Sequence, residues 1–265
     1  MVDEEKNDDK WRLLITKTDS YIEQMAIDEA NMNSLLRGET KPTLRICYFK
    51  KPSVSIGFFQ SVEKEVNVEL CNKLGIEIFR RMTGGGAVYK DPSGELNYSI
   101  IIEEDNFKIP FDIIGSYEKI CKAVISGLRE LGLKAEFRPI NDIIVNGRKI
   151  SGNAQTRKNG ILSQHGTILL NVDVDKMFSV LKVSDEKMRD KIIKDVKKRV
   201  TSINDELRKV GKKVGFSEVE KAIVNGFERV FSVELEKGEL TAREKEEAER
   251  LFREKYSTRE WNFWR

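Results

Sequence analysis

The chain of 265 residues has little histidine, cysteine or proline, and the first two shortages exclude whole classes of chemistry. Its single histidine, His165, cannot supply a multi-histidine metal site, and any Ser-His-Asp or Cys-His arrangement would have to be built around it. The three cysteines, Cys47, Cys71 and Cys121, are odd in number and unclustered. They argue against a zinc site and favour a reducing, cytoplasmic setting.

Long apolar runs and an excess of one charge are also missing. No run of about 18 apolar residues occurs, so no membrane span is expected. The opening "MVDEEKNDDK" is acidic and lacks the apolar core of a secretory signal. Lys and Arg number 47 against 44 Asp and Glu, a formal charge of +3, and no basic run is interleaved with aromatics. Nucleic acid and membrane are therefore not expected partners.

The most basic stretch, residues 182–200, has charges that alternate in sign. Alternating charge is typical of a solvated helix face, and binding of RNA or DNA is the less favoured interpretation. No internal repeat and no linker rich in proline, glycine or serine is present, so residues 1–265 are expected to form a single domain. The sheet-rich core is expected at about 12–172 and a helical part at about 173–265.

Local patterns predict the elements. An amphipathic helix is expected between the capping residues Thr18 to Ser20 and Gly38, and a second one within 115–132. Short β-rich stretches predict strands at 43–49, 53–57, 76–80 and 96–102.

Two hairpin signals, Asn146-Gly147 and Asn159-Gly160, follow, and later helices carry apparent capping boxes. The hairpins predict three antiparallel strands at about 142–145, 148–157 and 161–171. The capping boxes are Ser217/Glu220 and Thr241/Glu244. Strands and helices followed by helices indicate an α+β fold with a mixed, largely antiparallel sheet rather than a βαβ series.

A run of three glycines in "RRMTGGGAVYKD", residues 80–91, follows two arginines. It is not a Walker A loop, since no G-K-[ST] follows, and it lacks the G-x-G-x-x-G spacing. Bare backbone amides beside Arg80 and Arg81 favour an anion-binding loop. The alternative is a tight turn whose arginines lie in solvent.

The strand "RKISGNAQTR" alternates in polarity. Its parity predicts that a polar set shares one face and a small apolar set the other. The polar set is Lys149, Ser151, Asn153, Gln155 and Arg157, and the apolar set is Ile150, Gly152 and Ala154. The polar face is either a binding surface or the wet face of a sheet. Gly152 and Ala154 are poor strand formers, which indicates that something approaches the backbone closely.

Other polar residues have ordinary structural alternatives. Asn141 and Asp142 stand at a strand start, where a cap or turn is common, and a lone histidine is most often structural. These residues alone support only the binding of a phosphate-containing ligand.

Three motifs taken together, "RRMTGGGAVYKD", "NDIIVNGRKISGNAQ" and "QHGTILLN", resemble the lipoate–protein ligase A group of the biotin/lipoate A/B protein ligase family, in that family's order and spacing. "SIGFFQSVEKEVN" (55–67) and "EWNF" (260–263) extend the resemblance from about residue 12 to the end. It implies a sheet flanked by helices, similar to biotin ligases and class II aminoacyl-tRNA synthetases.

The resemblance implies that ATP and Mg²⁺ convert lipoate to lipoyl-AMP, and that the acyl group then passes to a lysine of a carrier. The expected carriers are the E2 lipoyl domain of 2-oxoacid dehydrogenases and the glycine cleavage H protein. Lys149 is expected to contact the carboxyl–phosphate junction. The expected adenylate-binding residues are Arg81, Thr83, Gly84, Gly85, Gly86, Ala87, Lys90, Asn141, Asp142, Gly152, Ala154 and His165.

Two departures from the family pattern stand out. Lys90-Asp91 replaces the usual His-Asp pair, although a lysine can still meet a phosphate. The sequence ends soon after "EWNF", so the small C-terminal accessory domain of many bacterial relatives is not expected here. The chain is therefore similar to archaeal two-part ligases, and a separate small accessory subunit is expected.

Three alternatives stay open: a biotin ligase, a binding relative without turnover, and an octanoyltransferase that uses a cysteine thioester. One octanoyltransferase branch places its cysteine just before the "GRK" strand, where "EFRPINDIIV" (136–145) has none. Another has Pro-Cys-Gly where this chain reads "VSD" (183–185). The residues therefore favour the ligase.

Overall fold

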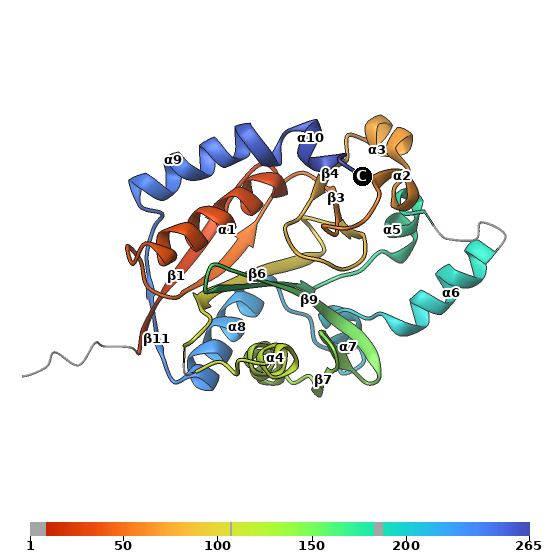
Figure 1. The fold of residues 1–265 in the computed structure, drawn as a ribbon. Coiled ribbons are helices and arrows are strands. Elements are labelled where there is room, and N and C mark those ends of the chain that lie inside the picture. Colours follow the sequence, from red (N-terminus) through yellow and green to blue (C-terminus); the bar gives the residue numbers. More distant parts are fainter. Residues whose placement is uncertain (1–8, 107, 183–187) are drawn as a thin grey trace, which may run out of the picture.

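The structure, a computed structural model, describes residues 9–106, 108–182 and 188–265, so "VSD" lies outside the described residues (Figure 1). The strands are β1 Lys10–Lys17, β2 Thr43–Tyr48, β3 Ser53–Ile56, β4 Glu77–Arg80, β5 Val88–Lys90, β6 Glu95–Glu103, β7 Ala135–Arg138, β8 Asp142–Val145, β9 Arg148–Lys158, β10 Ile161–Leu169 and β11 Glu234–Lys237. The helices are α1 Tyr21–Leu36, α2 Val62–Glu65, α3 Val68–Leu74, α4 Ile113–Glu130, α5 Val174–Val180, α6 Arg189–Arg199, α7 Ile203–Arg208, α8 Phe216–Phe231, α9 Ala242–Leu251, the π-helical turn η2 Phe252–Tyr256, and α10 Arg259–Asn262.

An eight-stranded mixed sheet in the order β11-β1-β2-β6-β10-β9-β8-β7 is the centre of the fold. From β2 onward its pairs are antiparallel, which confirms the predicted α+β class and the three hairpin strands. The prediction that the chain is helical from about 173 is wrong at β11, which pairs in parallel with β1. The stretch "ELEK" has no strand-like composition, and pairing with β1 rather than local propensity makes it a strand.

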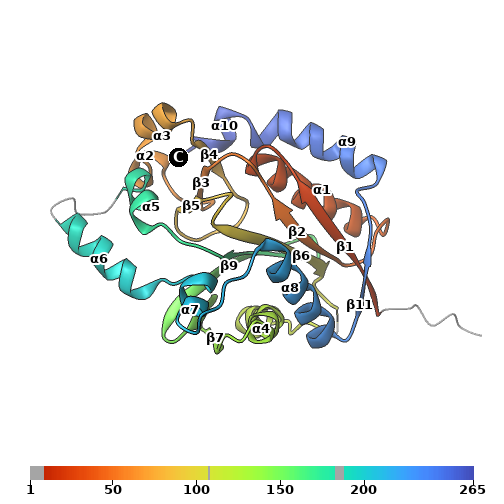
Figure 2. The same ribbon diagram turned by 180° about the vertical axis from the view of Figure 1, so that it is seen from behind.

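Helices cover both faces of this sheet (Figures 1 and 2). Along β6, Leu96, Tyr98, Ile100 and Ile102 join the apolar core formed with α4 and α8. On the opposite face, α1 lies against the sheet and α9 packs outside α1. A smaller sheet, β4-β3-β5, sits beside α1 and carries the glycine loop between β4 and β5.

Polar side chains fill part of the space between the main sheet and α1. Arg45 is fully buried, and its guanidinium lies 2.6 Å from the carboxylate of Asp28. Ser99 donates to the same carboxylate at 2.6 Å. Because these buried charges are paired and hydrogen-bonded, the polar groups between α1 and the main sheet are held in fixed positions next to the site described below.

Helix ends test the predicted caps. Thr241 and Glu244 form the predicted capping box at α9. The predicted box at Ser217 and Glu220 is wrong, because α8 begins after Gly215, whose amide donates to Glu218 at 2.8 Å. A glutamate follows three residues after Gly215 and also three residues after Ser217. The sequence alone therefore does not decide which of the two residues caps the helix.

Helix α6 has no buried residue, so the predicted solvated helix is confirmed over its described part. Among the described residues, no helix combines the length and apolarity needed to cross a membrane.

Candidate functional site

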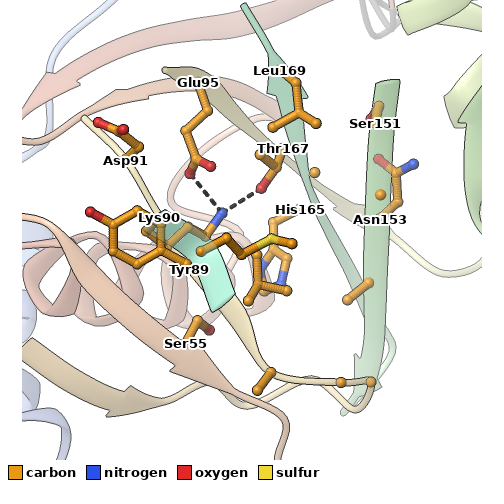
Figure 3. A pocket seen from close by; sticks show the side chains of 18 of the residues that line it. Ser55, Tyr89, Lys90, Asp91, Glu95, Ser151, Asn153, His165, Thr167 and Leu169 are labelled. Atoms are coloured by element: carbon orange, nitrogen blue, oxygen red, sulfur yellow. Dashed lines mark hydrogen bonds and ion pairs between the residues drawn. The ribbon is translucent and has the colours of Figure 1, made fainter. Parts of the chain in front are cut away.

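A cavity of about 370 Å³ opens between the glycine loop, the start of α1, and strands β9 and β10 (Figure 3). Most of the predicted site residues line it: Arg81, Gly84, Gly85, Gly86, Ala87, Lys90, Asn141, Lys149, Gly152, Ala154 and His165. Thr83 and Asp142 stand just behind its wall, where each holds a lining residue. The structure thus brings together residues from three separate sequence motifs.

Only one of the three loop glycines adopts a backbone conformation that favours glycine. Gly85 has φ +101°, a conformation that favours glycine. A Cβ on Gly84 or Gly86 would meet no atom within 4 Å, so these two residues border open space. The amides of all three make no hydrogen bond to another described residue. Unpaired amides around an open space form the kind of cradle that binds an anion.

Arg81 holds this loop rather than reaching into the cavity. Its guanidinium donates to the carbonyls of Gly84 at 2.7 Å and Gly86 at 2.9 Å, and contacts Ser55 and Thr83. Burial lowers the pKa of Arg81 to about 10, so the group stays charged at neutral pH. With its carbonyls bonded to Arg81, the loop can turn its amides toward the cavity.

His165 is neutral in this environment. Its pKa lies well below 6.5 because burial penalises the charged form, with Arg81, Lys90 and Arg45 as nearby cations. Its Nε2 lies 3.0 Å from the hydroxyl of Thr83, which already accepts from Arg81. The Thr83 hydroxyl is therefore assigned as the donor to Nε2, which places the imidazole proton on Nδ1.

A β-bulge sets the direction of Lys149. Opposite β8, Ser151 pairs with Ile143 while Lys149 pairs with Ile144, so Ile150 is an extra residue in β9. A Cβ on Gly152 would lie 2.9 Å from Cε of Lys149 and 3.0 Å from its Nζ. The bulge therefore places Lys149 over Gly152, and the close approach predicted at Gly152 is the lysine side chain itself.

The predicted alternation of β9 is wrong in its assignment of faces. Asn153, expected beside Lys149, points to the α4 side, where it accepts from Tyr98 Oη at 2.7 Å and donates to Cys121 Sγ at 3.4 Å. Gln155 and Arg157 likewise bond to Ser116 of α4. Asn153, Gln155 and Arg157 thus bond on the α4 side, whereas Gly152 and Ala154 line the cavity with Lys149. Ile150 lies in the apolar core.

Both the ammonium and the backbone of Lys149 make contacts that hold it in place. Its ammonium lies 2.6 Å from Oδ1 of Asp142, and its side chain is 42% exposed. Its carbonyl accepts the amide of Thr201 at 2.8 Å, and Val200 forms an isolated bridge beside it. The support that residues 200–201 give this lysine could not be predicted from the sequence, because the contact joins segments about 50 positions apart.

The base of the cavity holds a buried ion pair (Figure 3). Nζ of Lys90 lies 3.1 Å from Glu95 and 2.6 Å from Asn97 Oδ1, and also donates to Thr167. Burial lowers the pKa of Lys90 and raises that of Glu95, and their mutual attraction opposes both shifts. With three acceptors around it, the ammonium has no donor left for a phosphate, so this arrangement does not favour the predicted contact.

Asn141 and Gly166 fix the strands around the cavity. Asn141 donates to the carbonyl of Asn153 at 2.5 Å and accepts its amide at 3.1 Å. A Cβ on Gly166 would lie 2.1 Å from Asn153 Oδ1 and 2.3 Å from the ring of Tyr98. The glycine of the "HG" pair is therefore required by packing on the α4 side, while His165 faces the cavity.

The three cysteines are all buried, and none of them lines the cavity. Burial raises the pKa of Cys47 and of Cys71 to about 11, and that of Cys121 to about 12. Such thiols are protonated near neutral pH and are poor nucleophiles.

The lining fits an acyl chain joined to an anionic group. Tyr21, Met25 and Leu169 supply apolar surface, and the loop amides and Lys149 supply positive charge. Among the residues that the structure describes, the buried hydroxyl of Ser151 has no hydrogen-bond partner. In the described ranges, no cluster of three or more acidic, histidine or cysteine side chains is suited to a metal. A divalent ion here would therefore depend on substrate phosphates for most of its ligands.

Comparison with known proteins agrees with this geometry. A family model described as the lipoyl protein ligase A/B catalytic domain matches residues 20–228. An octanoyltransferase, LipM of Kyrpidia tusciae, is 37% identical and aligns over 96% of this chain and 98% of its own length. A bi-partite lipoate protein ligase from Thermoplasma acidophilum, solved in a study that included its E2 lipoyl domain, is 36% identical with a TM-score of 0.85, and 96% of each chain is covered. A lipoate-protein ligase A bound with ATP is 32% identical with a TM-score of 0.82, covering 96% of this chain and 98% of its own.

Proposed function

Because this chain belongs to the lipoyl protein ligase A/B family, we propose that it is a lipoate–protein ligase that activates lipoate with ATP and joins it to a lysine of an acceptor protein. The family also contains octanoyltransferases, and relatives of that name are as similar in sequence as the ligases. The choice between the two depends on the chemistry that this chain's own residues can perform.

The observation that carries the proposal is the burial of every cysteine. An octanoyltransferase of the thioester type needs an accessible thiolate near the acyl site. Here Cys47, Cys71 and Cys121 are at most 2% exposed, and β7, which precedes β8 and the Lys149 strand, contains no cysteine. An adenylate route needs no covalent bond to the enzyme, and it uses the cationic groups that the cavity presents.

In the first step, a carboxylate oxygen of lipoate would attack the α-phosphorus of ATP, forming an O–P bond while the bond to pyrophosphate breaks. Two anions must approach each other, so the ammonium of Lys149 and the amides of the glycine loop would offset the charge. Mg²⁺ would neutralise phosphate charge and would be held mainly by phosphate oxygens, with Asp142, the carboxylate paired with Lys149, as a candidate ligand. Neutral His165 would add no further charge.

In the second step, the acceptor amine would attack the acyl carbon of lipoyl-AMP, and AMP would leave as the amide bond forms and the amine loses a proton. Lys149 would stabilise the oxyanion of the tetrahedral intermediate. Its ion pair with Asp142 and its backbone bond to Thr201 would hold the ammonium in place for both steps.

The proposed acceptors are lipoyl carrier proteins, the E2 lipoyl domain first, since the study of the similar Thermoplasma ligase included its own E2 lipoyl domain. The glycine cleavage H protein is the second expected acceptor. That ligase is described as bi-partite, and we propose that activation here also uses a separate small subunit.

Acyl-enzyme mass spectrometry tests the choice of mechanism. The chain is incubated with an octanoylated carrier, and separately with lipoate, ATP and Mg²⁺, and its intact mass is measured before and after hydroxylamine. A ligase leaves the chain unmodified in both arms, and lipoyl hydroxamate forms in the second arm once the small subunit is supplied. An octanoyl adduct on any cysteine would overturn the proposal in favour of thioester transfer.

A further inference from the structure

Helix α6 concentrates positive charge on one surface element. Its eleven residues carry six basic and two acidic side chains, a net charge of +4, whereas the whole chain carries +3. The remainder of the protein is therefore close to neutral. None of the α6 side chains is buried, and the helix extends away from the body of the molecule in both ribbon views (Figures 1 and 2).

The position of α6 connects it to the cavity. The helix ends at Arg199, and the next residue, Val200, lines the cavity and pairs with Lys149. Thr201 then donates its amide to the carbonyl of Lys149. The C-terminal end of the basic helix thus lies beside the cavity, one residue before the segment that pairs with Lys149.

Three lysines of α6 form a row along the helix with few ion-pair partners. Lys191, Lys194 and Lys198 follow at spacings of three and four, so they share one face of the helix. Lys198 lies 3.9 Å from Asp195, a weak exposed pair. Within the described parts of the chain, Lys191 and Lys194 have no ion-pair partner. A row of cations with so little neutralisation inside the protein is suited to an acidic surface outside it.

We propose that α6 is a docking surface for the acceptor protein, and that the acceptor presents acidic side chains around its modified lysine. This inference rests on the proposed function, because the acceptor lysine must reach the acyl carbon beside Lys149. A folded acceptor whose lysine enters the cavity must also cover the protein surface next to its mouth, and α6 lies there. Charge complementarity along α6 would speed encounter and orient the acceptor.

A protein fits this helix better than a nucleic acid. Asp190 and Asp195 interrupt the basic residues, and α6 carries no aromatic side chain on which a base could stack. An acidic protein surface tolerates such mixed charge, since it presents its own mixture of side chains.

The test uses Lys191→Glu/Lys194→Glu/Lys198→Glu and a matched control, Lys41→Glu/Lys221→Glu/Lys237→Glu. The control lysines are exposed and lie before β2, on α8 and on β11, away from α6, and both triples change the net charge by the same amount. Each protein is given prepared lipoyl-AMP and either an acidic apo lipoyl domain or hydroxylamine. Transfer to each acceptor is followed at low and at high salt.

We expect the α6 triple to lower kcat/KM for the lipoyl domain about tenfold or more at low salt, mainly through KM. High salt should narrow the difference, and hydroxylamine should react at the wild-type rate. Equal kinetics in the α6 and control triples would overturn the docking surface. An equal loss of rate with hydroxylamine would also overturn it, because the defect would then lie at Lys149. A third contradicting result is a triple that loses binding to an RNA oligonucleotide while its kinetics with the acceptor stay unchanged. A wild-type protein that modifies no acceptor would instead defeat the proposed function.

Discussion

Lys149→Met separates the chemical role of this lysine from any structural one. Methionine keeps an unbranched stem over Gly152, where the lysine side chain packs, and removes only the ammonium. The ion pair with Asp142 joins side chains that are 42% and 26% exposed, so its loss should cost about 1 kcal/mol or less. For a chain of this size that corresponds to a fall in Tm of about 2 to 4 °C.

The effect on activity should be far larger. An ammonium placed to offset charge in the transition state is worth about 10²- to 10³-fold in rate, or roughly 3 to 4 kcal/mol. The assay follows the mass of an apo lipoyl domain after single-turnover reaction with prepared lipoyl-AMP, alongside the melting temperature of each variant. Lys158→Met is the control, because Lys158 stands on the same strand, is 60% exposed and lies 3.6 Å from Glu29.

Two results would refute this reasoning. One is a Lys149→Met protein that transfers at more than about a tenth of the wild-type rate, which would show that the ammonium is not needed. The other is a fall in melting temperature large enough to account for the lost activity, which would make Lys149 a structural residue.

The other predictions concern the walls of the cavity. Lys90→Met should lower the free energy of unfolding by about 3 to 5 kcal/mol, because Glu95 is left buried without its cation, and adding Glu95→Gln should restore most of it in urea titrations. Failure of the double variant to recover would contradict this. Gly57→Ala should cost about 1 to 3 kcal/mol, because its Cβ would lie 1.9 Å from a loop carbonyl, whereas Gly84→Ala should cost far less by the same measurement. Neutral His165 makes stability fall as pH drops below about 6.5, where only the unfolded chain gains a proton, so His165→Gln should flatten that part of the pH profile. An unchanged slope would show that His165 is protonated in the fold.

Features set by local chemistry could be predicted from the sequence. Asn146-Gly147 and Asn159-Gly160 both adopt positive φ, so the two hairpins follow from turn residues alone. The glycine loop was also recognisable, since three adjacent glycines beside arginines have few explanations other than close approach or an anion. Most of the predicted site residues accordingly meet around one cavity.

Features set by pairing between distant segments could not be predicted. The bulge at Ile150 depends on the register between β8 and β9, and one extra residue reverses which side chains share a face with Lys149. The strand β11 exists because β1 lies beside it, not because of its composition.

Arg81 and Lys90 show the same limit for the site. Their sequence positions predicted contact with the ligand, but each is engaged by protein acceptors that only the fold reveals. For Glu95 the available signal was a carboxylate at the start of a strand that is rich in apolar residues, which indicates a buried partner without identifying it.

The measurement that tests the central claim most directly is acyl transfer by the chain with all three cysteines replaced by alanine. The protein is mixed with an apo lipoyl domain, Mg²⁺ and either lipoate with ATP or prepared lipoyl-AMP, and the mass of the domain is recorded. If the chain is an adenylate-forming ligase, the variant should transfer the lipoyl group from lipoyl-AMP at the rate of the unsubstituted chain. It should also modify the domain from lipoate and ATP if the unsubstituted chain does so. A cysteine-free chain that is folded but inactive, beside an active parent, would contradict the account and assign the reaction to a thioester.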